Sequence, residues 1–272
     1  MSTSETLLQD ESFPGAQRNA SLKIPHWVRV LLSLGIGLVL WEFAGRFVIT
    51  DRLFFAPFSL VMQNLIALFA DGTIYYHLYI SGSEFVIGYA AAIVIGVLVG
   101  VLMGISNPLA TFLDPWVSAL YATPLVALTP LFILVFGIGV ESKAALVFTL
   151  AVFPVLISTY SGMLSVDKNY LDVADSFSAS SLQKIFKVLI PGALPFMISG
   201  FRLAVGKALT AVVVGELFFS SAGVGHLISI STQTFNSPRL FACVLIFSLS
   251  GVLLTAALYW LERRLAPWRS AA

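Results

Sequence analysis

The sequence has few charged residues, one cysteine and three histidines. Only 11% of its 272 residues are charged and 58% are hydrophobic, whereas soluble domains carry about 25% charged residues. The single cysteine, Cys243, excludes a disulfide framework within the chain. A formal net charge of +1 and the lack of a basic patch give no indication of a nucleic-acid partner. The composition therefore predicts a protein embedded in a lipid bilayer.

The usual catalytic and metal-binding patterns are also absent from the sequence. His26, His77 and His226 are isolated from one another, with no acidic or cysteine neighbours at ligand spacing, so no metal site is expected. Residues 200–207 resemble a phosphate-binding loop, but the spacing is one residue too long and Ala208 stands where Ser or Thr would bind magnesium. No Gly-x-Ser-x-Gly elbow occurs. We therefore expect no catalytic residue and no cofactor, and a chain that moves a solute rather than converts it.

Apolar runs predict an all-α polytopic membrane protein with six transmembrane helices. Each run is about 20 residues long, which at 1.5 Å per residue crosses a hydrocarbon core of roughly 30 Å. A further helix, lying along the membrane surface, is predicted within residues 57–69. Residues 106–114 and 220–239 are expected to be connections, the second with a re-entrant turn at 223–225. The predicted spans are residues 30–49, 85–105, 115–137, 143–164, 195–219 and 240–261.

The second predicted span carries a small residue at every fourth position, which places these residues on one face of the helix. Two helix backbones approach closely along such a face. The pattern therefore predicts a tight seam with another helix. The small residues are Gly88, Ala92, Gly96, Gly100 and Gly104.

The third predicted span is interrupted by Pro124 and Pro130. Each proline frees a backbone carbonyl, which is tolerated where a helix faces protein or a wet cavity rather than lipid. Two interpretations stay open for these prolines, namely kinks satisfied by neighbouring helices or a helix that lines a solute pathway. In the second case the candidate lining residues of this span are Tyr121, Thr123 and Thr129.

The fifth predicted span carries Arg202, Lys207 and Glu216. A charge at the bilayer centre costs about 3 kcal/mol even on a lenient insertion scale, so such groups face the protein interior or a wet path. Lys207 lies midway along the span, and Glu216 is half a turn away in angle, so the two cannot pair within one helix. Both are pathway candidates. For Lys207, contact with an anionic substrate and a structural ion pair between helices both stay open.

Residues 165–191 form a polar island between the fourth and fifth predicted spans. Apolar residues recur there at helical spacing in two groups, which predicts two short amphipathic helices. The second begins at Ser180, which forms a capping box with Gln183, and Pro191 and Pro195 are expected to close the unit. Neither water nor hydrocarbon suits both faces of such helices, so the pattern predicts a soluble protein partner.

This loop resembles the signature of permease subunits of bacterial ABC importers: a Glu-Ala-Ala triplet, a glycine four residues later and an Ile-x-Leu-Pro ending. The spacing is kept, with residues 172–174 on the triplet, Ser178 on the glycine and residues 188–191 on the ending. Asp replaces Glu, Val replaces the first Ala and Ser replaces Gly. Residues 200–228 and the segment from Trp260 resemble the nitrate, sulfonate and taurine branch of this family.

The resemblance covers roughly residues 30–268 and implies the fold of a type I importer permease, with cytoplasmic coupling helices between spans 4 and 5. It also implies two cytoplasmic ABC ATPase subunits, a second permease copy in a homodimer and a periplasmic substrate-binding protein as partners. Nitrate, a sulfonate, taurine or a similar small solute is the implied substrate. The residues implied to dock on the ATPase are Asp172, Val173, Ala174, Phe177, Ser178, Ala179, Ser180 and Leu182.

The distribution of Lys and Arg predicts the orientation in the membrane. Most of these residues fall on the side of both termini and of residues 165–191, so this side is predicted to be cytoplasmic in a multi-pass protein of the bacterial inner membrane. The predicted organisation is a tail without the features of a secretory signal (1–27), a permease domain (28–265) and a second tail (266–272). The basic residues on the cytoplasmic side are Arg18, Lys23, Arg29, Lys168, Lys184, Lys187, Arg263, Arg264 and Arg269, and those on the other side are Arg52, Lys143 and Arg239, with Arg46 near the end of the first span.

Two other functions were weighed against the importer subunit. An ion-coupled secondary transporter would use Lys207 and Glu216 as its coupling pair, but it is expected to contain inverted repeats, for which the two halves give no convincing evidence. A membrane scaffold would need only structural charges and does not account for the spacing from Asp172 to Pro191. We therefore predict the membrane-spanning subunit of an ATP-driven importer.

Overall fold

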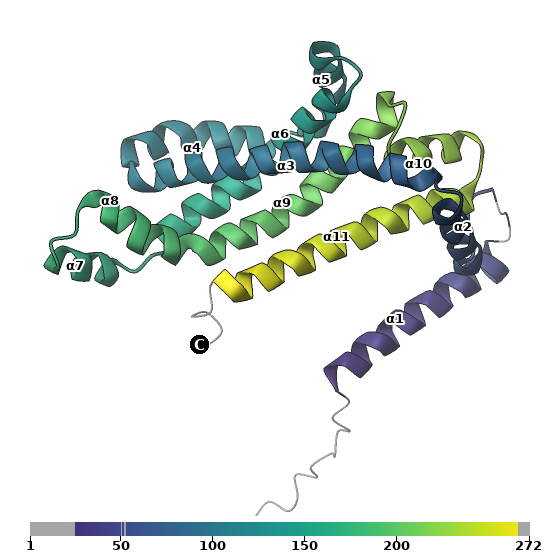
Figure 1. The fold of residues 1–272 in the computed structure, drawn as a ribbon, viewed down its shortest axis with the longest axis horizontal. Coiled ribbons are helices and arrows are strands. Elements are labelled where there is room, and N and C mark those ends of the chain that lie inside the picture. Colours follow the sequence, from purple (N-terminus) through teal and green to yellow (C-terminus); the bar gives the residue numbers. More distant parts are fainter. Residues whose placement is uncertain (1–24, 50, 52, 266–272) are drawn as a thin grey trace, which may run out of the picture.

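The computed structural model describes residues 25–49, 51 and 53–265. The regular elements in these residues are helices, and the long ones run side by side in an elongated bundle (Figure 1). Within these described residues, five helices are long and apolar enough to cross a membrane, and a bent pair makes a sixth if it is counted as one span. The all-α polytopic prediction is confirmed. The predicted tails, residues 1–27 and 266–272, lie outside the described residues except for residues 25–27.

The bundle has two distinct ends (Figure 1). One carries α7 (Lys168–Ser176) and α8 (Ser181–Lys184), and we call it the α7–α8 end. The opposite end carries α2 (Phe58–Ala70) and α10 (Val224–Gln233), and we call it the α10 end. The helices that run between the ends are α3 (Thr73–Ile105), α6 (Val140–Leu164), α9 (Ile190–Phe219) and α11 (Ser237–Leu265).

The seam between α3 and α6 lies at the centre of the bundle. A Cβ atom added to Gly96 would stand 2.8 Å from Val155 Cγ1, and one added to Gly100 would stand 2.7 Å from Thr159 Cβ. Ala92, in the same row, is fully buried. Since any larger side chain in this row would push α6 away, the close approach requires small residues. The predicted seam is confirmed, and its partner helix is α6.

The predicted third span is a broken helix. It begins with α4 (Asn107–Ala122), directly after Ser106, so the prediction of a turn over 106–114 is wrong. The chain then bends by 80° and continues as the 3₁₀ helix η2 (Leu125–Leu128) and as α5 (Thr129–Phe136). Pro124 lies at the bend, and Pro130 lies in the first turn of α5. Backbone N–H groups in the first turn of a helix have no partner within that helix, so the N–H that proline lacks costs no hydrogen bond there.

The prediction that prolines close residues 165–191 is also wrong. From α8 the chain continues without a break through η3 (Ile185–Leu189), a π-helical turn, into α9. Pro191 lies in the first turn of α9 and Pro195 lies inside it. The neighbouring helical turns tolerate both prolines, so the fifth span begins in the polar segment and not after it.

Residues 220–239 are mostly helical rather than a loop. Gly223 has φ +115° and makes a sharp turn, after which α10 begins at Val224. Apolar side chains of α10, including Leu227 and Ile228, pack in a buried hydrophobic cluster with residues of α2 and α11. A buried apolar face stabilises a helix in a stretch that its Ser, Gly and Thr content predicted to be irregular.

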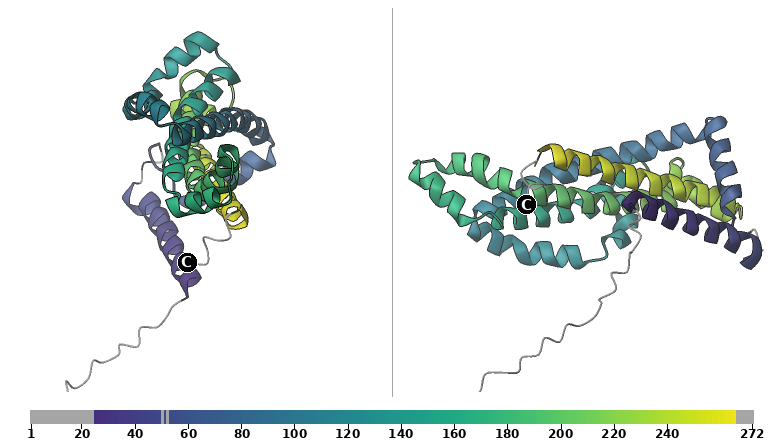
Figure 2. Two further views of the ribbon diagram at one scale, coloured as in Figure 1. Left: turned by 90° about the vertical axis from the view of Figure 1, so that its left-hand side faces the viewer. Right: turned by 90° about the horizontal axis from the view of Figure 1, so that it is seen from below.

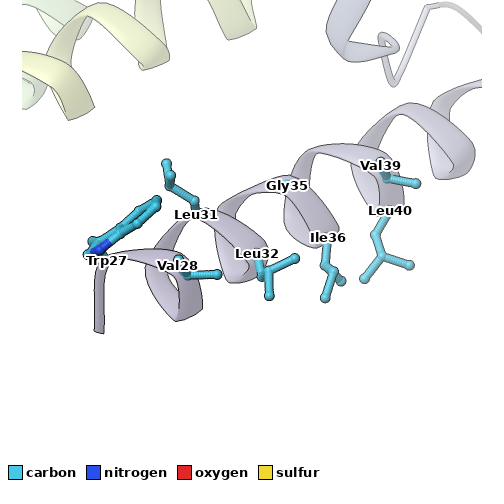
Figure 3. A pocket seen from close by; sticks show the side chains of 8 residues that line it. All are labelled: Trp27, Val28, Leu31, Leu32, Gly35, Ile36, Val39 and Leu40. Carbon is cyan, nitrogen blue, oxygen red and sulfur yellow. The ribbon is translucent and has the colours of Figure 1, made fainter. Parts of the chain in front are cut away.

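The first helix, α1 (His26–Phe43), continues as the π-helical turn η1 (Ala44–Val48) and stands apart from the bundle (Figures 1 and 2). Near its end Trp41 donates a hydrogen bond to the carbonyl of Ala56 at 3.0 Å. A shallow hollow along α1 is lined by α1 residues alone (Figure 3). An apolar helix with so little packing in its own chain needs lipid or another protein around it.

Candidate functional site

The two helices at the α7–α8 end each begin at a capped residue. Asp167 accepts a hydrogen bond from the backbone N–H of Asn169 at 2.9 Å and caps α7. The Ser180 hydroxyl accepts from Gln183 N–H at 3.3 Å, and the Gln183 side chain accepts from Ser180 N–H at 2.8 Å. This reciprocal pair confirms the predicted capping box and sets the start of α8.

The turn between α7 and α8 has the backbone geometry of a glycine turn. Ser178 has φ +53°, in the left-handed region. The backbone N–H of Ala179 donates to the carbonyl of Ala174 at 3.0 Å, and Lys184 forms an ion pair with Asp175 at 2.5 Å across the turn. Ser178, which falls on the glycine of the signature that this loop resembles, adopts the conformation that glycine permits.

The apolar side chains of the α7–α8 unit are open to the surroundings. Phe177 is 84% exposed. The residues predicted to dock on an ATPase are all exposed or half-buried in this chain. A cluster of large exposed apolar groups is typical of a protein-binding surface. Its most exposed members are Tyr170, Val173, Phe177, Leu182 and Phe186.

Lys207 lies midway along α9 on an exposed strip of this helix. Leu203 and Thr210 are exposed on the same strip, and a Cβ atom on Gly206 would have nothing within 4 Å. No described residue forms a hydrogen bond or an ion pair with Lys207. The structural ion pair that the sequence left open is therefore not formed within the described part of the chain. We call this surface, which comprises Leu203, Gly206, Lys207 and Thr210, the Lys207 strip.

The candidate lining residues of the broken span differ in accessibility. Tyr121 and Thr123, next to the bend, are exposed. Thr129 is buried, and its hydroxyl donates to the carbonyl of Val126 at 2.6 Å in the first turn of α5. Tyr121 and Thr123 therefore lie at the surface of the chain, whereas Thr129 belongs to the packing of the bend, and the lining role stays a prediction.

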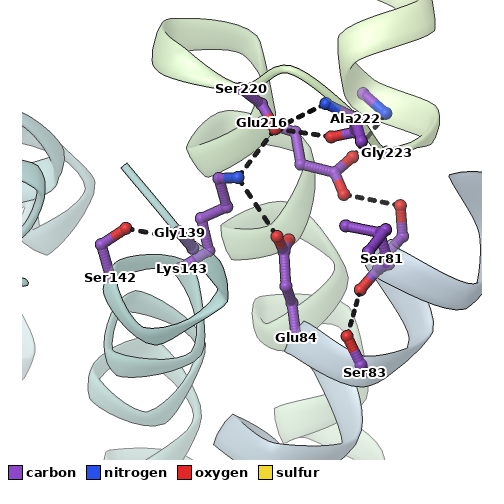
Figure 4. Close-up of polar contacts among 12 residues, drawn as sticks. Ser81, Ser83, Glu84, Gly139, Ser142, Lys143, Glu216, Ser220, Ala222 and Gly223 are labelled. Atoms are coloured by element: carbon purple, nitrogen blue, oxygen red, sulfur yellow. Dashed lines mark hydrogen bonds and ion pairs between the residues drawn. The ribbon is translucent and has the colours of Figure 1, made fainter. Parts of the chain in front are cut away.

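Glu216 does not lie on the Lys207 strip. It is fully buried at the α10 end of α9, with 0% of its surface exposed. Its Oε1 accepts a hydrogen bond from Ser81 Oγ at 2.6 Å, and its Oε2 accepts from the backbone N–H of Gly225 at 2.6 Å (Figure 4). In this conformation Glu216 lines no accessible surface, contrary to its selection as a pathway candidate, and it belongs to an interior network.

Two further charged residues complete this network. Glu84 of α3 is fully buried and Lys143 of α6 is 5% exposed. The Lys143 Nζ lies 3.2 Å from Glu84 Oε1 and donates to Ser220 Oγ at 2.7 Å (Figure 4). Glu84 directly precedes the predicted second span and was not among the residues predicted for a functional site. Its spacing of three from Ser81 places both on one helical face, and this was the available signal.

Histidines lie beside the network. His77 Nδ1 accepts a hydrogen bond from Gly223 N–H at 2.9 Å, and its ring stacks on that of His226 with centroids 6.4 Å apart. The expectation of isolated histidines is therefore wrong for this pair. Burial lowers the pKa of His226, and the positive charge of Lys143 acts in the same direction. Among the described residues no group of three or more His, Cys, Asp or Glu could hold a metal ion.

The fold and the exposed helical pair define a class of protein, a polytopic membrane protein with an uncovered apolar surface at one end. One solved structure with the same fold is the methionine ABC transporter MetNI in an inward-facing conformation. The TM-score is 0.61 at 17% sequence identity, and the match covers 70% of this chain and 94% of that chain. A likeness at this identity establishes the fold alone.

Residues 92–267 match the family of binding-protein-dependent transport system inner membrane components, and the chain belongs to this family. Its relatives include SsuC of Bacillus subtilis (strain 168), named as an aliphatic sulfonates transport permease, at 34% identity over 90% of this chain and 89% of that protein. They also include the taurine transport system permease protein TauC of Escherichia coli (strain K12), at 30% identity over 88% of this chain and 90% of that protein. A third is the formylaminopyrimidine transport permease protein ThiX of Halalkalibacterium halodurans, at 31% identity over 85% and 92%.

The family assignment confirms the resemblance drawn from residues 172–191. The chain is the transmembrane permease subunit of an ABC importer, in the sulfonate and taurine branch. It is a translocation subunit without an ATPase of its own, and ATP is hydrolysed by a separate partner. The ion-coupled transporter and the scaffold are thereby set aside.

Proposed function

We propose that this permease carries a small solute with a sulfonate group, such as an alkanesulfonate anion or the zwitterion taurine, across the bacterial inner membrane. In this proposal two copies of the chain form the path, two ABC ATPase subunits bind the cytoplasmic α7–α8 end, and a substrate-binding protein delivers the solute to the periplasmic α10 end. The names of SsuC and TauC support the substrate class. The observation that carries the proposal is the exposed apolar surface of the α7–α8 unit.

Charge and exposure together support a soluble partner at this surface. Asp172 and Asp175 are exposed beside the open side chain of Phe177. Carboxylates keep such a unit out of hydrocarbon, and water does not stabilise a cluster of large apolar groups. A cleft on a soluble protein satisfies both. The bias of Lys and Arg toward the same side supports a cytoplasmic partner.

The exposed surfaces of α1 and α9 support a second permease copy. Lys207 lies in the middle of a membrane-spanning helix without a partner among the described residues. Facing hydrocarbon would cost this ammonium group about 3 kcal/mol or more. A twofold partner that encloses a wet path along the Lys207 strip removes that cost, because the lysine then faces water or an anionic solute.

The test is recovery of the ATPase with the tagged chain from detergent-solubilised native membranes. The wild-type chain is expected to recover a cytoplasmic ATPase subunit. Ala174→Arg places a bulky charge in the docking surface, and Phe177→Ala removes an exposed apolar group that this chain does not pack. Both are expected to lower recovery about tenfold or more, as for hot-spot residues of an interface, with little change in the thermal unfolding of the permease.

Phe54→Ala is the matched control, because Phe54 is 70% exposed at the opposite end of the bundle. It is expected to leave ATPase recovery at the wild-type level. If both Ala174→Arg and Phe177→Ala recovered the ATPase at the wild-type level, the ATPase would not dock on the α7–α8 unit. Recovery of the permease alone would contradict the proposed assembly as a whole.

A second prediction concerns the substrate. Lys207→Met is expected to lower uptake of taurine or an alkanesulfonate about tenfold while leaving thermal stability near the wild-type value, because the ammonium group stabilises the sulfonate group and no internal partner is lost. Lys207→Arg, which keeps the charge, is expected to retain more uptake than Lys207→Met. Radiolabelled uptake in proteoliposomes measures both. Normal uptake with Lys207→Met would exclude a role for this side chain in the path.

A further inference from the structure

The first backbone N–H groups of α10 are bound by side chains from distant parts of the chain. The residue before α10 is Gly223, which has no side chain with which to cap the helix. Three successive N–H groups, at residues 223 to 225, donate instead to side chains on α3 and α9. These acceptors are His77 Nδ1 at 2.9 Å, Ser81 Oγ at 2.9 Å and Glu216 Oε2 at 2.6 Å.

Glu216 is the centre of this arrangement. The Ser81 hydroxyl accepts from Val224 N–H and donates to Glu216 Oε1, while Glu216 Oε2 accepts from Gly225 N–H. The bonds therefore close a ring in which one carboxylate joins α3, α9 and the start of α10. A carboxylate at a helix N-terminus is also stabilised by the helix dipole.

Both glycines of the turn are needed for this contact. A Cβ atom on Gly225 would stand 2.9 Å from Glu216 Oε2, and one on Gly223 would lie within 2.6 Å of the same oxygen. Gly223 also has φ +115°, which L side chains rarely adopt. The carboxylate of Glu216 therefore packs directly beneath the backbone of the turn, with no room for another group between them.

The other side of the turn is fixed as well. Lys143 of α6, paired with Glu84 of α3, donates to Ser220 Oγ, and Ser220 Oγ donates to the carbonyl of Ala222 at 2.5 Å. The connection from α9 to α10 is thus held by three of the long helices of the bundle. At its other end α10 leads to the exposed residues Thr232, Gln233 and Phe235.

We propose that Glu216 is a positioning residue that couples α10 to α9. This inference rests on the proposed function, in which the α10 end receives the substrate-binding protein. Because Glu216 ties the start of α10 to the last turns of α9, a displacement of α10 on docking moves α9. The same rigid helix carries Lys207 nine residues away, about 13.5 Å along its axis. A displacement of α10 on docking therefore also displaces the Lys207 strip.

The test uses the assembled complex of permease, ATPase and substrate-binding protein in lipid nanodiscs. The measured quantity is the increase in ATP hydrolysis when binding protein and taurine are added. Glu216→Gln keeps the size of the side chain but replaces one acceptor oxygen with an NH₂ group that faces a donor. Ser81 and Gly225 donate to the two carboxylate oxygens, so the new NH₂ group would face a donor and one hydrogen bond would be lost. The variant is therefore expected to lower the increase in ATP hydrolysis about tenfold.

Two further variants approach the contact from other sides. Gly223→Ala places a methyl group against the Glu216 carboxylate and is expected to reproduce the loss of stimulation. Ser81→Ala removes the bridging hydroxyl and is the variant to use if Glu216→Gln does not assemble with the ATPase.

Glu262→Gln is the matched control. Glu262 is a buried carboxylate that accepts a hydrogen bond from Arg202 of α9 at 2.8 Å, but it lies at the α7–α8 end. Its replacement is expected to leave the stimulated fraction unchanged.

The outcomes separate this inference from the proposed function. A wild-type complex without stimulation by binding protein and taurine would contradict the proposed function, whatever Glu216 does. A stimulated wild-type complex, with Glu216→Gln and Gly223→Ala assembled and equally stimulated, would overturn the coupling role. An equal loss with Glu262→Gln would also overturn it, because any buried carboxylate on these helices would then have the same effect. Loss confined to the α10-end variants would establish the coupling.

Discussion

The α10 end and the exposed α7–α8 unit accommodate their charged and apolar groups differently. At the α10 end Glu84 and Glu216 are fully buried: Glu216 accepts hydrogen bonds from Ser81 and Gly225, whereas Glu84 has Lys143 as its counter-ion but accepts no hydrogen bond within the described residues. At the α7–α8 end the ion pair between Lys184 and Asp175 lies at the surface, and Phe177 is open to the surroundings. Buried charges need internal partners, whereas exposed apolar groups are stabilised by another molecule.

This difference indicates which end depends on a second protein. The α10 end is held together within one chain, so a docked protein meets a preformed surface there. The α7–α8 unit is shaped by its caps and by the turn at Ser178, but its apolar face has no cover in this chain. We therefore expect substitutions to act on the stability of the permease at one end and on association at the other.

The largest expected effect is that of Lys143→Met. This change leaves the fully buried carboxylate of Glu84 without its counter-ion, and we expect the free energy of unfolding to fall by about 3–5 kcal/mol. Thermal or denaturant unfolding in detergent measures the loss. The double variant Lys143→Met with Glu84→Gln removes both charges and is expected to recover part of it. If the Lys143→Met protein were as stable as the wild type, the ion pair between Lys143 and Glu84 would not stabilise the α10 end.

Between the two ends, Gly96→Leu is expected to destabilise the permease by about 1–3 kcal/mol, because the new side chain overlaps Val155 across the α3–α6 seam. Gly206→Leu is the matched control, since a Cβ atom there meets nothing within 4 Å. It is expected to leave the unfolding of the single chain unchanged while blocking uptake, because Gly206 lies on the Lys207 strip. If the two variants were equally stable to heat, close packing along the α3–α6 seam would not contribute to the stability of the permease.

At the α7–α8 end, Ser178→Val places a β-branched residue at φ +53°. The left-handed conformation disfavours such a residue by about 1–2 kcal/mol, so we expect faster hydrogen exchange of α7 and weaker recovery of the ATPase. Ser178→Gly adopts this φ without strain and is expected to keep wild-type recovery. If both variants recover the ATPase equally well, the geometry of this turn does not control docking.

The smallest expected effect is that of Lys184→Met, which makes the same chemical change as Lys143→Met at the opposite end. The ion pair with Asp175 is partly exposed, and such pairs contribute about 0.2–1 kcal/mol. The unfolding midpoint is expected to change little, and the difference between the two lysine variants is the direct measure of the contrast between the ends. A loss as large as that of Lys143→Met would refute this contrast.

Several features could be predicted from the sequence because they depend on neighbours in the chain. The apolar runs predicted the spans, the four-residue spacing from Gly88 to Gly104 predicted the seam, and Ser180 with Gln183 predicted a cap that the structure contains. The spacing from residue 172 to residue 191 indicated the family, which residues 92–267 confirm. Hydropathy, helical period and capping depend on residues within about 20 positions of one another in the sequence, so they can be recognised without coordinates.

Other features were decided by packing between distant segments. Ser81 and Glu216 meet across 135 positions of sequence, and Glu216 therefore resembled a pathway residue until its partners were known. The expected loop over 220–239 became α10, because contacts with α2 and α11 stabilise a helix that its composition did not favour. Pro191, expected to close the polar unit, lies within a continuous helical path because the helical turns around it tolerate a proline.

The sequence by itself determined the class of protein, the membrane-spanning helices and the amphipathic pair at residues 168–184, because each depends on a local pattern of apolar and polar residues. Only the tertiary structure decided which charges are buried and which are open. Glu84, Lys143 and Glu216 come from three different helices, and their burial depends on how those helices pack. Lys207 stays open for the complementary reason, since no other described helix of the chain supplies it with a partner.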